Sequence, residues 1–104
     1  MLPSQTPEAR TAALQKAAEA RQARALVKHR LKFGGASITE ILMQGRGDDA
    51  IGRMKVSALL ESMPGVGKIK ARSIMDELGI ADNRRIRGLG VQQMRAIANY
   101  FEGA

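Results

Sequence analysis

Apolar and polar positions along the chain follow helical spacing, and no stretch alternates with the period of two that is typical of a strand. Residues 8–33 contain no glycine or proline, and alanine, the best helix former, dominates them. Thr6 is placed to cap a helix, with Pro7 at its first position and Glu8 in its first turn. We therefore predict one helix over residues 7–32, about 39 Å long.

One face of this predicted helix is basic. Five side chains fall within about 80° of one another on a helical wheel: Arg10, Arg21, Arg24, Lys28 and Lys32. The apolar stripe beside them is mostly alanine, and only Val27 and Leu31 are large enough to pack strongly. We expect residues 1–33 to form a separate basic helix with a disordered start and a poorly anchored N-terminal half.

The rest of the chain reads as a compact bundle of short helices over residues 34–104. The sequence "SITE" at 37–40 is a capping-box pattern that opens one short helix. Asp49 is predicted to cap a second short turn that leads to Lys55. The sequence "VSALLESM" at 56–63 indicates an apolar helix that Pro64 ends.

Two longer helices are predicted after Pro64, separated by a basic loop. The first runs from about Gly67 to Leu78, because Gly79 stops it, and the last covers about 91–102. The sequence "IADNRRIRGLG" between them has no periodic pattern. The predicted fold class is all-α: a long N-terminal basic helix followed by a compact helical bundle.

Each of these last two helices belongs to one copy of a short sequence repeat. "GVGKIKARSIMDEL" at 65–78 aligns without gaps with "GLGVQQMRAIANYF" at 88–101. In each copy an aliphatic residue stands between two glycines and a helix follows, so the repeat indicates a structural duplication. The aliphatic residue is expected to plug the core and hold the turn still.

A glycine turn before a helix suits an anion. The first turn of a helix has unpaired N–H donors and the positive end of the helix dipole, and glycine lets another group approach them. Phosphate groups bind in such places. Lys68 and Arg72 lie at the edge of the first of these two helices, and Arg84, Arg85 and Arg87 precede the second turn. A plain packing turn is the alternative for either glycine pair taken alone.

The composition points to a polyanion as partner. Seventeen Lys and Arg oppose ten Asp and Glu, for a net charge of +7. The excess lies at the two ends, with +5 in residues 1–32 and +3 in residues 64–104, against −1 between them. There is no cysteine and no long apolar run. A cytoplasmic monomer that needs no cofactor, metal, membrane or small-molecule substrate is expected.

Catalysis is not predicted. The chain has one histidine, His29, on a basic helix, and its densest acids, Asp48-Asp49 and Asp76-Glu77, look like a helix cap and a solvated helix end. Nothing here has the pattern of a catalytic pocket or of metal-binding carboxylates. Only three aromatic residues are present, so stacking platforms for single strands are also missing.

The sequence "LLESMPGVGKIKA" resembles the helix-hairpin-helix signature of proteins that grip DNA backbones, and its duplicated form resembles the helix-two-turns-helix arrangement. A longer stretch, "KVSALLESMPGVGKIKARSIMDELGIADNRRIRGLG", follows an Ala/Arg-rich helix and "GGASITEIL". Together they closely resemble the actinobacterial integration host factor family, over essentially the whole chain. That resemblance implies a nucleoid-associated protein that binds duplex DNA, changes its shape, and supports recombination and compaction.

By resemblance, the turn at 64–68 and the basic loop at 84–90 would be the main DNA-contacting elements. As part of a backbone clamp formed by both turns, we also expect Arg87 to enter the minor groove. The complete set of predicted DNA-binding residues is Gly65, Val66, Gly67, Lys68, Lys70, Arg72, Arg84, Arg85, Arg87, Gly88, Gly90, Arg21, Arg24, Lys28 and Lys55. A basic helical protein that binds RNA or the ribosome is the alternative function, since a backbone clamp can suit either duplex.

Overall fold

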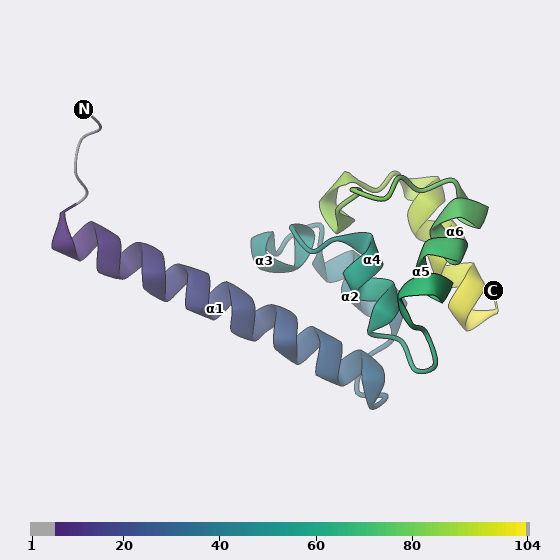
Figure 1. The fold of residues 1–104 in the computed structure, drawn as a ribbon, viewed down its shortest axis with the longest axis horizontal. Coiled ribbons are helices and arrows are strands. Elements are labelled where there is room, and N and C mark those ends of the chain that lie inside the picture. Colours follow the sequence, from purple (N-terminus) through teal and green to yellow (C-terminus); the bar gives the residue numbers. More distant parts are fainter. Residues whose placement is uncertain (1–5, 104) are drawn as a thin grey trace.

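A computed structural model describes residues 6–103 and contains only helices, turns and loops in that range (Figure 1). The helices are α1 (Pro7–Lys32), α2 (Ile38–Gln44), α3 (Asp49–Gly52), α4 (Val56–Glu61), α5 (Lys68–Leu78), the 3-10 turn η1 (Ile86–Gly88) and α6 (Val91–Glu102). The predicted all-α fold is confirmed. The predicted disordered start concerns residues 1–5, which lie outside the described range.

Helix α1 projects from the bundle and gives the molecule its elongated shape (Figure 1). It begins where predicted, because the Thr6 side chain accepts a hydrogen bond from the Ala9 N–H at 3.0 Å. Val27 and Leu31 are buried in the common core, whereas every side chain from residue 6 to residue 17 is exposed. The apolar stripe therefore anchors α1 only through its C-terminal part, which passes beside α3 and α2.

The core is built from one apolar face of each short helix. Its members alternate with exposed positions at helical spacing, so each helix buries a stripe against the others. The largest fully buried side chains are Ile38, Ile41, Leu42, Val56, Leu59, Leu60, Ile74, Met75, Ile86 and Ile97. No buried polar or charged residue occurs among residues 6–103.

Two predicted helix boundaries were wrong. Asp48, not Asp49, caps α3, because its side chain accepts a hydrogen bond from the Ile51 N–H at 3.2 Å. This three-residue reach is the one that an N-cap side chain requires. Helix α4 ends at Glu61, two residues before the predicted Met63. The residue before a proline is disfavoured in the helical region, so the chain leaves the helix ahead of Pro64.

The basic loop is held to the segment between α3 and α4. The Val56 N–H donates to the Arg84 carbonyl, and the Ile86 N–H donates to the Met54 carbonyl, each at 2.9 Å. These bonds make a single antiparallel bridge between Lys55 and Arg85. Ile86, only 1% exposed, enters the core beside them. A segment that the sequence showed only as a loop is thus fixed by backbone pairing and burial.

Gly52 allows this part of the fold to close. A Cβ atom at position 52 would lie 2.6 Å from the carbonyl oxygen of Gly45 and 3.2 Å from the Cβ of Arg87. Both neighbours are held by the chain, so neither can move aside easily. The segment that follows α2, helix α3 and the basic loop consequently meet at a point that only glycine fits.

Gly52→Ala is expected to destabilise the protein by about 1–3 kcal/mol, the usual cost of overpacking a closed contact. Gly47→Ala is the matched control, because nothing lies within 4 Å of a Cβ at that position. Urea unfolding followed by circular dichroism measures both. Equal midpoints for the two variants would show that the contact at Gly52 relaxes freely.

Candidate nucleic-acid interface

The hairpin turn, residues 64–68, places a helix N-terminus at the surface. Gly65 has φ +76°, a left-handed conformation that L side chains rarely adopt. The next residue, Val66, is 8% exposed, and its N–H donates to the Met63 carbonyl at 3.1 Å. Val66 thus plugs the core as predicted and holds the turn that leads into α5.

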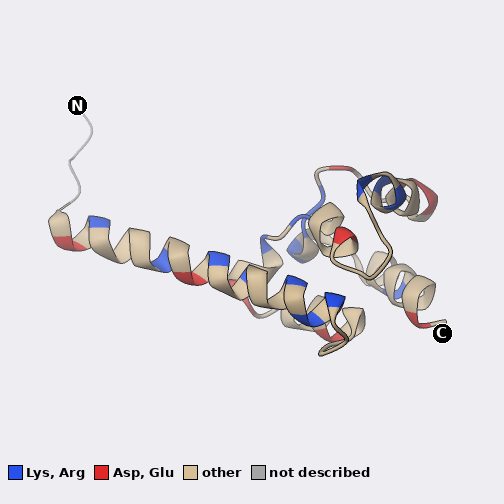
Figure 2. Cartoon of the chain, turned by 60° about the horizontal axis from the view of Figure 1, so that its bottom comes forward, with Lys and Arg blue, Asp and Glu red and all other residues tan. Residues whose placement is uncertain are grey.

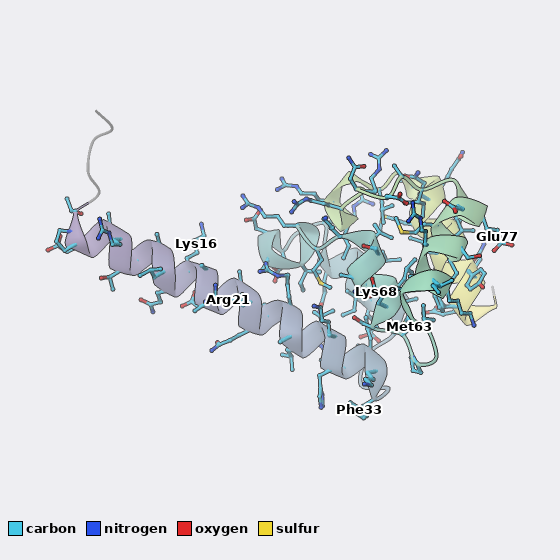
Figure 3. All side chains as sticks on the ribbon, viewed as in Figure 1. Lys16, Arg21, Phe33, Met63, Lys68 and Glu77 are labelled. Carbon is cyan, nitrogen blue, oxygen red and sulfur yellow. The ribbon has the colours of Figure 1, made fainter. Side chains whose placement is uncertain are left out.

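The first turn of α5 is open to a ligand. Gly67 is the N-cap and has no side chain to bond the helix amides. Within residues 6–103, the N–H groups of residues 68–70 have no hydrogen-bond acceptor, and nothing lies within 4 Å of a Cβ at Gly67. Lys68, labelled in Figure 3, and Lys70 are both exposed in this first turn. Free donors, the helix dipole and two cations together form a site that suits an anion.

The second glycine turn has a different structure. Leu89 is partly buried like Val66, and Gly90 caps α6 as Gly67 caps α5. Gly88, however, lies in η1 without a positive φ, and its carbonyl accepts a hydrogen bond from Arg84 at 3.1 Å. The Gly90 N–H donates to the Gln93 side chain at 3.1 Å. The repeat therefore keeps its plug and its helix, but the protein itself already satisfies part of the second turn.

The two turns lie at opposite ends of α5 (Figure 1). The Gln93 side chain donates to the carbonyl of Gly79, at the C-terminal end of α5, at 3.4 Å. The hairpin turn is at the other end of this 11-residue helix, which is about 16 Å long. The turns therefore form two separate sites and do not combine into one pocket.

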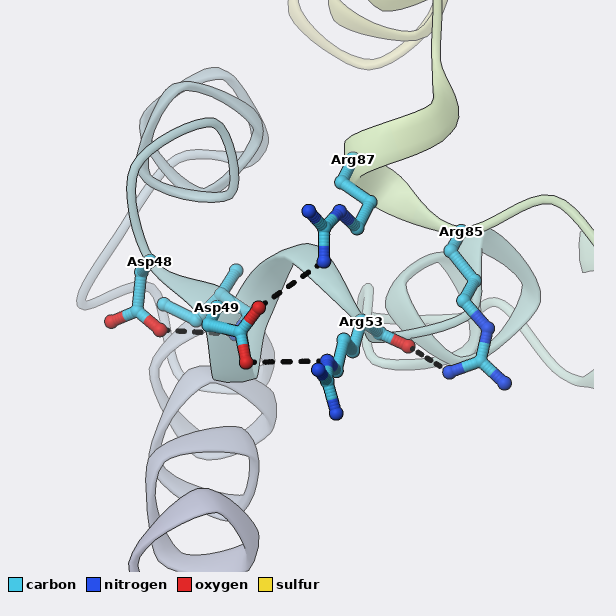
Figure 4. A network of polar contacts seen from close by, with 6 residues as sticks. Asp48, Asp49, Arg53, Arg85 and Arg87 are labelled. Carbon is cyan, nitrogen blue, oxygen red and sulfur yellow. Dashed lines mark hydrogen bonds and ion pairs between the residues drawn. The ribbon is translucent and has the colours of Figure 1, made fainter.

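An arginine cluster lies where the basic loop meets the segment between α3 and α4 (Figure 4). It consists of Arg53, Arg85 and Arg87. Arg85 donates to the Arg53 carbonyl at 2.9 Å. Asp49 binds Arg87 and Arg53 at once, each at 3.2 Å. Sequence reasoning missed Arg53 and the role of Asp49. The spacing of four residues between Asp49 and Arg53 was the available signal for that pair, whereas Arg87 is 38 residues from Asp49.

Arg72 has a partner within the protein. Its guanidinium lies 3.3 Å from the Asp82 carboxylate, and its side chain is 72% exposed. An exposed ion pair of this kind contributes only about 0–1 kcal/mol, so a competing anion can displace it. Lys68, by contrast, is in no ion pair among the described residues.

Helix α1 brings basic residues to the hairpin turn and to Arg53. Arg21 and Lys28 are exposed, and half-buried Arg24 lines a cleft of about 550 Å³ together with Arg53 and the two acids that begin α3. Lys32 lines a cleft of about 310 Å³ against the hairpin turn. Figure 2 shows basic residues along α1 and over the loops of the bundle. Lys55 is exposed and pairs through its backbone with Arg85.

Residues 6–103 contain no group of three or more histidine or acidic side chains placed to hold a metal ion. In the same range, no helix combines the length and the apolar character that a bilayer crossing requires.

Comparison with known proteins identifies the family. The sequence model described as S13-like H2TH domain matches residues 31–101. The integration host factor of Streptomyces coelicolor is 58% identical over 100 residues, which are 96% of this chain and 94% of that protein. The integration host factor of Mycobacterium tuberculosis is 54% identical over 103 residues, 99% of this chain and 98% of its own. The chain belongs to the integration host factor family of actinobacteria.

A solved structure supports the same fold for this integration host factor family member. It is described as sIHF bound to an 8bp palindromic DNA, and it matches with a TM-score of 0.82 and 56% sequence identity. The match covers 84% of this chain and 98% of the other. The helix-two-turns-helix bundle expected from the sequence resemblance is thereby confirmed.

Replacing each glycine of the hairpin turn in turn should show which of the two the backbone conformation requires. Gly65→Ala is expected to cost about 1–2 kcal/mol, because it places a side chain in the left-handed region. Gly67→Ala should change stability far less, since Gly67 is extended and has open space in front of it. Thermal unfolding of both variants tests this. An equal loss of stability in the two variants would contradict the special requirement for glycine at position 65.

Proposed function

We propose that this chain is a nucleoid-associated protein that binds double-stranded DNA through the phosphate backbone, with weak sequence preference. The observation that carries the proposal is the open N-terminus of α5, whose free amides stand beside Lys68 and Lys70 in a family whose member sIHF was solved bound to DNA. A helix N-terminus of this kind recognises phosphate regardless of the neighbouring base.

The proposed interface has three main parts, and Lys55, Lys70 and Arg72 beside them complete the fifteen residues predicted from the sequence. The hairpin turn and the basic loop belong to the DNA-binding domain, residues 34–104, and α1 extends the contact along neighbouring DNA. Because about 16 Å separates the ends of α5, the two turns bind separate phosphates. Lys32 of α1 approaches the hairpin turn, and Arg24 of α1 approaches Arg53 of the arginine cluster.

Bending or compaction of DNA follows from this arrangement, and we propose that it assists recombination. A rigid bundle that holds several phosphates at set positions selects duplexes that deform to meet them. No helix within residues 6–103 presents polar side chains in the manner of a major-groove reading helix, so base-specific contacts contribute little. Sequence preference then arises from the flexibility of the duplex.

The direct test compares three nucleic acids of matched sequence and length in gel shifts: duplex DNA, duplex RNA and single-stranded DNA. Duplex DNA is expected to bind most tightly. Binding of duplex RNA at equal or higher affinity would favour the RNA-binding alternative. A second assay, ring closure of short DNA by ligase, reports bending independently of affinity, and unchanged closure would contradict the proposed shape change.

The salt dependence of binding should report how many phosphates are neutralised. If five to eight are contacted, the slope of log K against log salt is expected to be about −5 to −7. Lys68→Ala should weaken binding to all sequences alike and flatten the slope by about one, because it removes one phosphate contact. Arg85→Ala should act in the same direction.

Arg30→Gln is the matched control for the loss of one positive charge. Arg30 lies on the side of α1 away from the basic stripe and donates to the Gly35 carbonyl at 3.1 Å. Its replacement should leave the slope nearly unchanged. A loss with Lys68→Ala that depends on DNA sequence, with the slope unaltered, would refute a phosphate contact at this residue.

A further inference from the structure

One carboxylate lies between two arginines at the edge of the proposed interface (Figure 4). The Oδ1 atom of Asp49 is 3.2 Å from Nη1 of Arg87, and its Oδ2 atom is 3.2 Å from Nε of Arg53. The side chains of all three remain largely in solvent, at 56%, 58% and 61% exposure respectively. The carboxylate is thus held by guanidinium groups and not by burial.

The two guanidinium groups are mounted on backbone that is already fixed. Arg87 follows buried Ile86 in η1, and its Cβ faces Gly52 at close range. The carbonyl of Arg53 accepts a hydrogen bond from Arg85 at 2.9 Å. Asp49 has no capping duty, because the Asp48 side chain caps α3. The backbone positions of the two arginines therefore do not depend on the carboxylate that joins their side chains.

A phosphate group offers what this position requires. It presents two oxygens to two guanidinium groups just as a carboxylate does, and each such charge-assisted hydrogen bond is strong for either anion. We propose that Arg53 and Arg87 form a phosphate site that Asp49 occupies in the free protein and that the DNA backbone takes over on binding. This inference rests on the proposed function and adds Arg53 to the interface. It also assigns Arg87 to a phosphate and not to the minor groove.

Asp49 then limits affinity. While its carboxylate stays beside the arginines, it neutralises charge that would otherwise act on DNA, and it repels an incoming phosphate. Asp49→Asn keeps the size of the side chain and removes the charge. We expect it to tighten duplex DNA binding about threefold to fivefold at low salt, which is the range of one exposed ion pair. The salt slope should become steeper by about one, because one more phosphate is effectively neutralised.

Glu77→Gln is the matched control, since it removes one negative charge from an exposed position on α5 at the far side of the molecule (Figure 3). It should change affinity and slope much less than Asp49→Asn. Arg53→Ala is the complementary variant and should weaken binding to all sequences and flatten the slope by about one. Thermal unfolding is measured for every variant, so that a loss of structure is recognised.

The possible outcomes are distinct. Tighter binding and a steeper slope with Asp49→Asn alone support the phosphate site. If Asp49→Asn and Glu77→Gln change affinity and slope equally, the effect comes from net charge alone, and the proposed phosphate site is overturned. Weaker binding with Asp49→Asn means that the carboxylate only orients the arginines, which also overturns it. If Asp49→Asn does not fold, Arg53→Ala decides. If the unmodified protein fails to bind duplex DNA, the proposed function fails instead.

Discussion

The burial of Ile86 sets the position of the basic loop, and the arginine cluster depends on it. Two backbone hydrogen bonds pair residues 84 and 86 with residues 54 and 56. Arg85 has an extended backbone, and Arg87 lies in the 3-10 turn η1. With Ile86 in the core, the arginines on either side of it are left in solvent. Burying one isoleucine stabilises the protein by about 1.5–3 kcal/mol, which exceeds the repulsion expected between exposed arginines.

Acidic residues make this gathering of positive charge tolerable. Asp49 neutralises part of the arginine cluster, and Asp82 does the same for Arg72 near the C-terminal end of α5. These pairs are exposed, so each adds little to stability and remains open to exchange with another anion. Arginines that were buried or tightly paired within the protein would not exchange their partners for a phosphate. These acids therefore lower the repulsion within the basic surface and leave its arginines exposed.

The two glycine turns show how one local sequence pattern can reach two structures. Both copies bury an aliphatic residue in the common core and begin a helix at a glycine. They differ where other segments intervene. In the second turn, the Arg84 side chain donates to the Gly88 carbonyl, and the Gln93 side chain bonds both Gly90 and Gly79. In the hairpin turn, no side chain of the described chain bonds the free N–H groups of residues 68–70. The hairpin turn is the more open anion site for this reason.

Local sequence is sufficient to predict the helices, the all-α class, the anchoring of α1 through Val27 and Leu31, and the burial of Val66. It also carries the family likeness, because capping residues, helical periodicity and motif spacing act over only a few residues. Three features arise only in the folded chain: Asp49 meets Arg87, 38 residues away, Gly52 must lack a side chain, and the two turns stand at opposite ends of α5. Contacts of this kind exist only once packed helices bring distant residues together, so no local pattern could predict them.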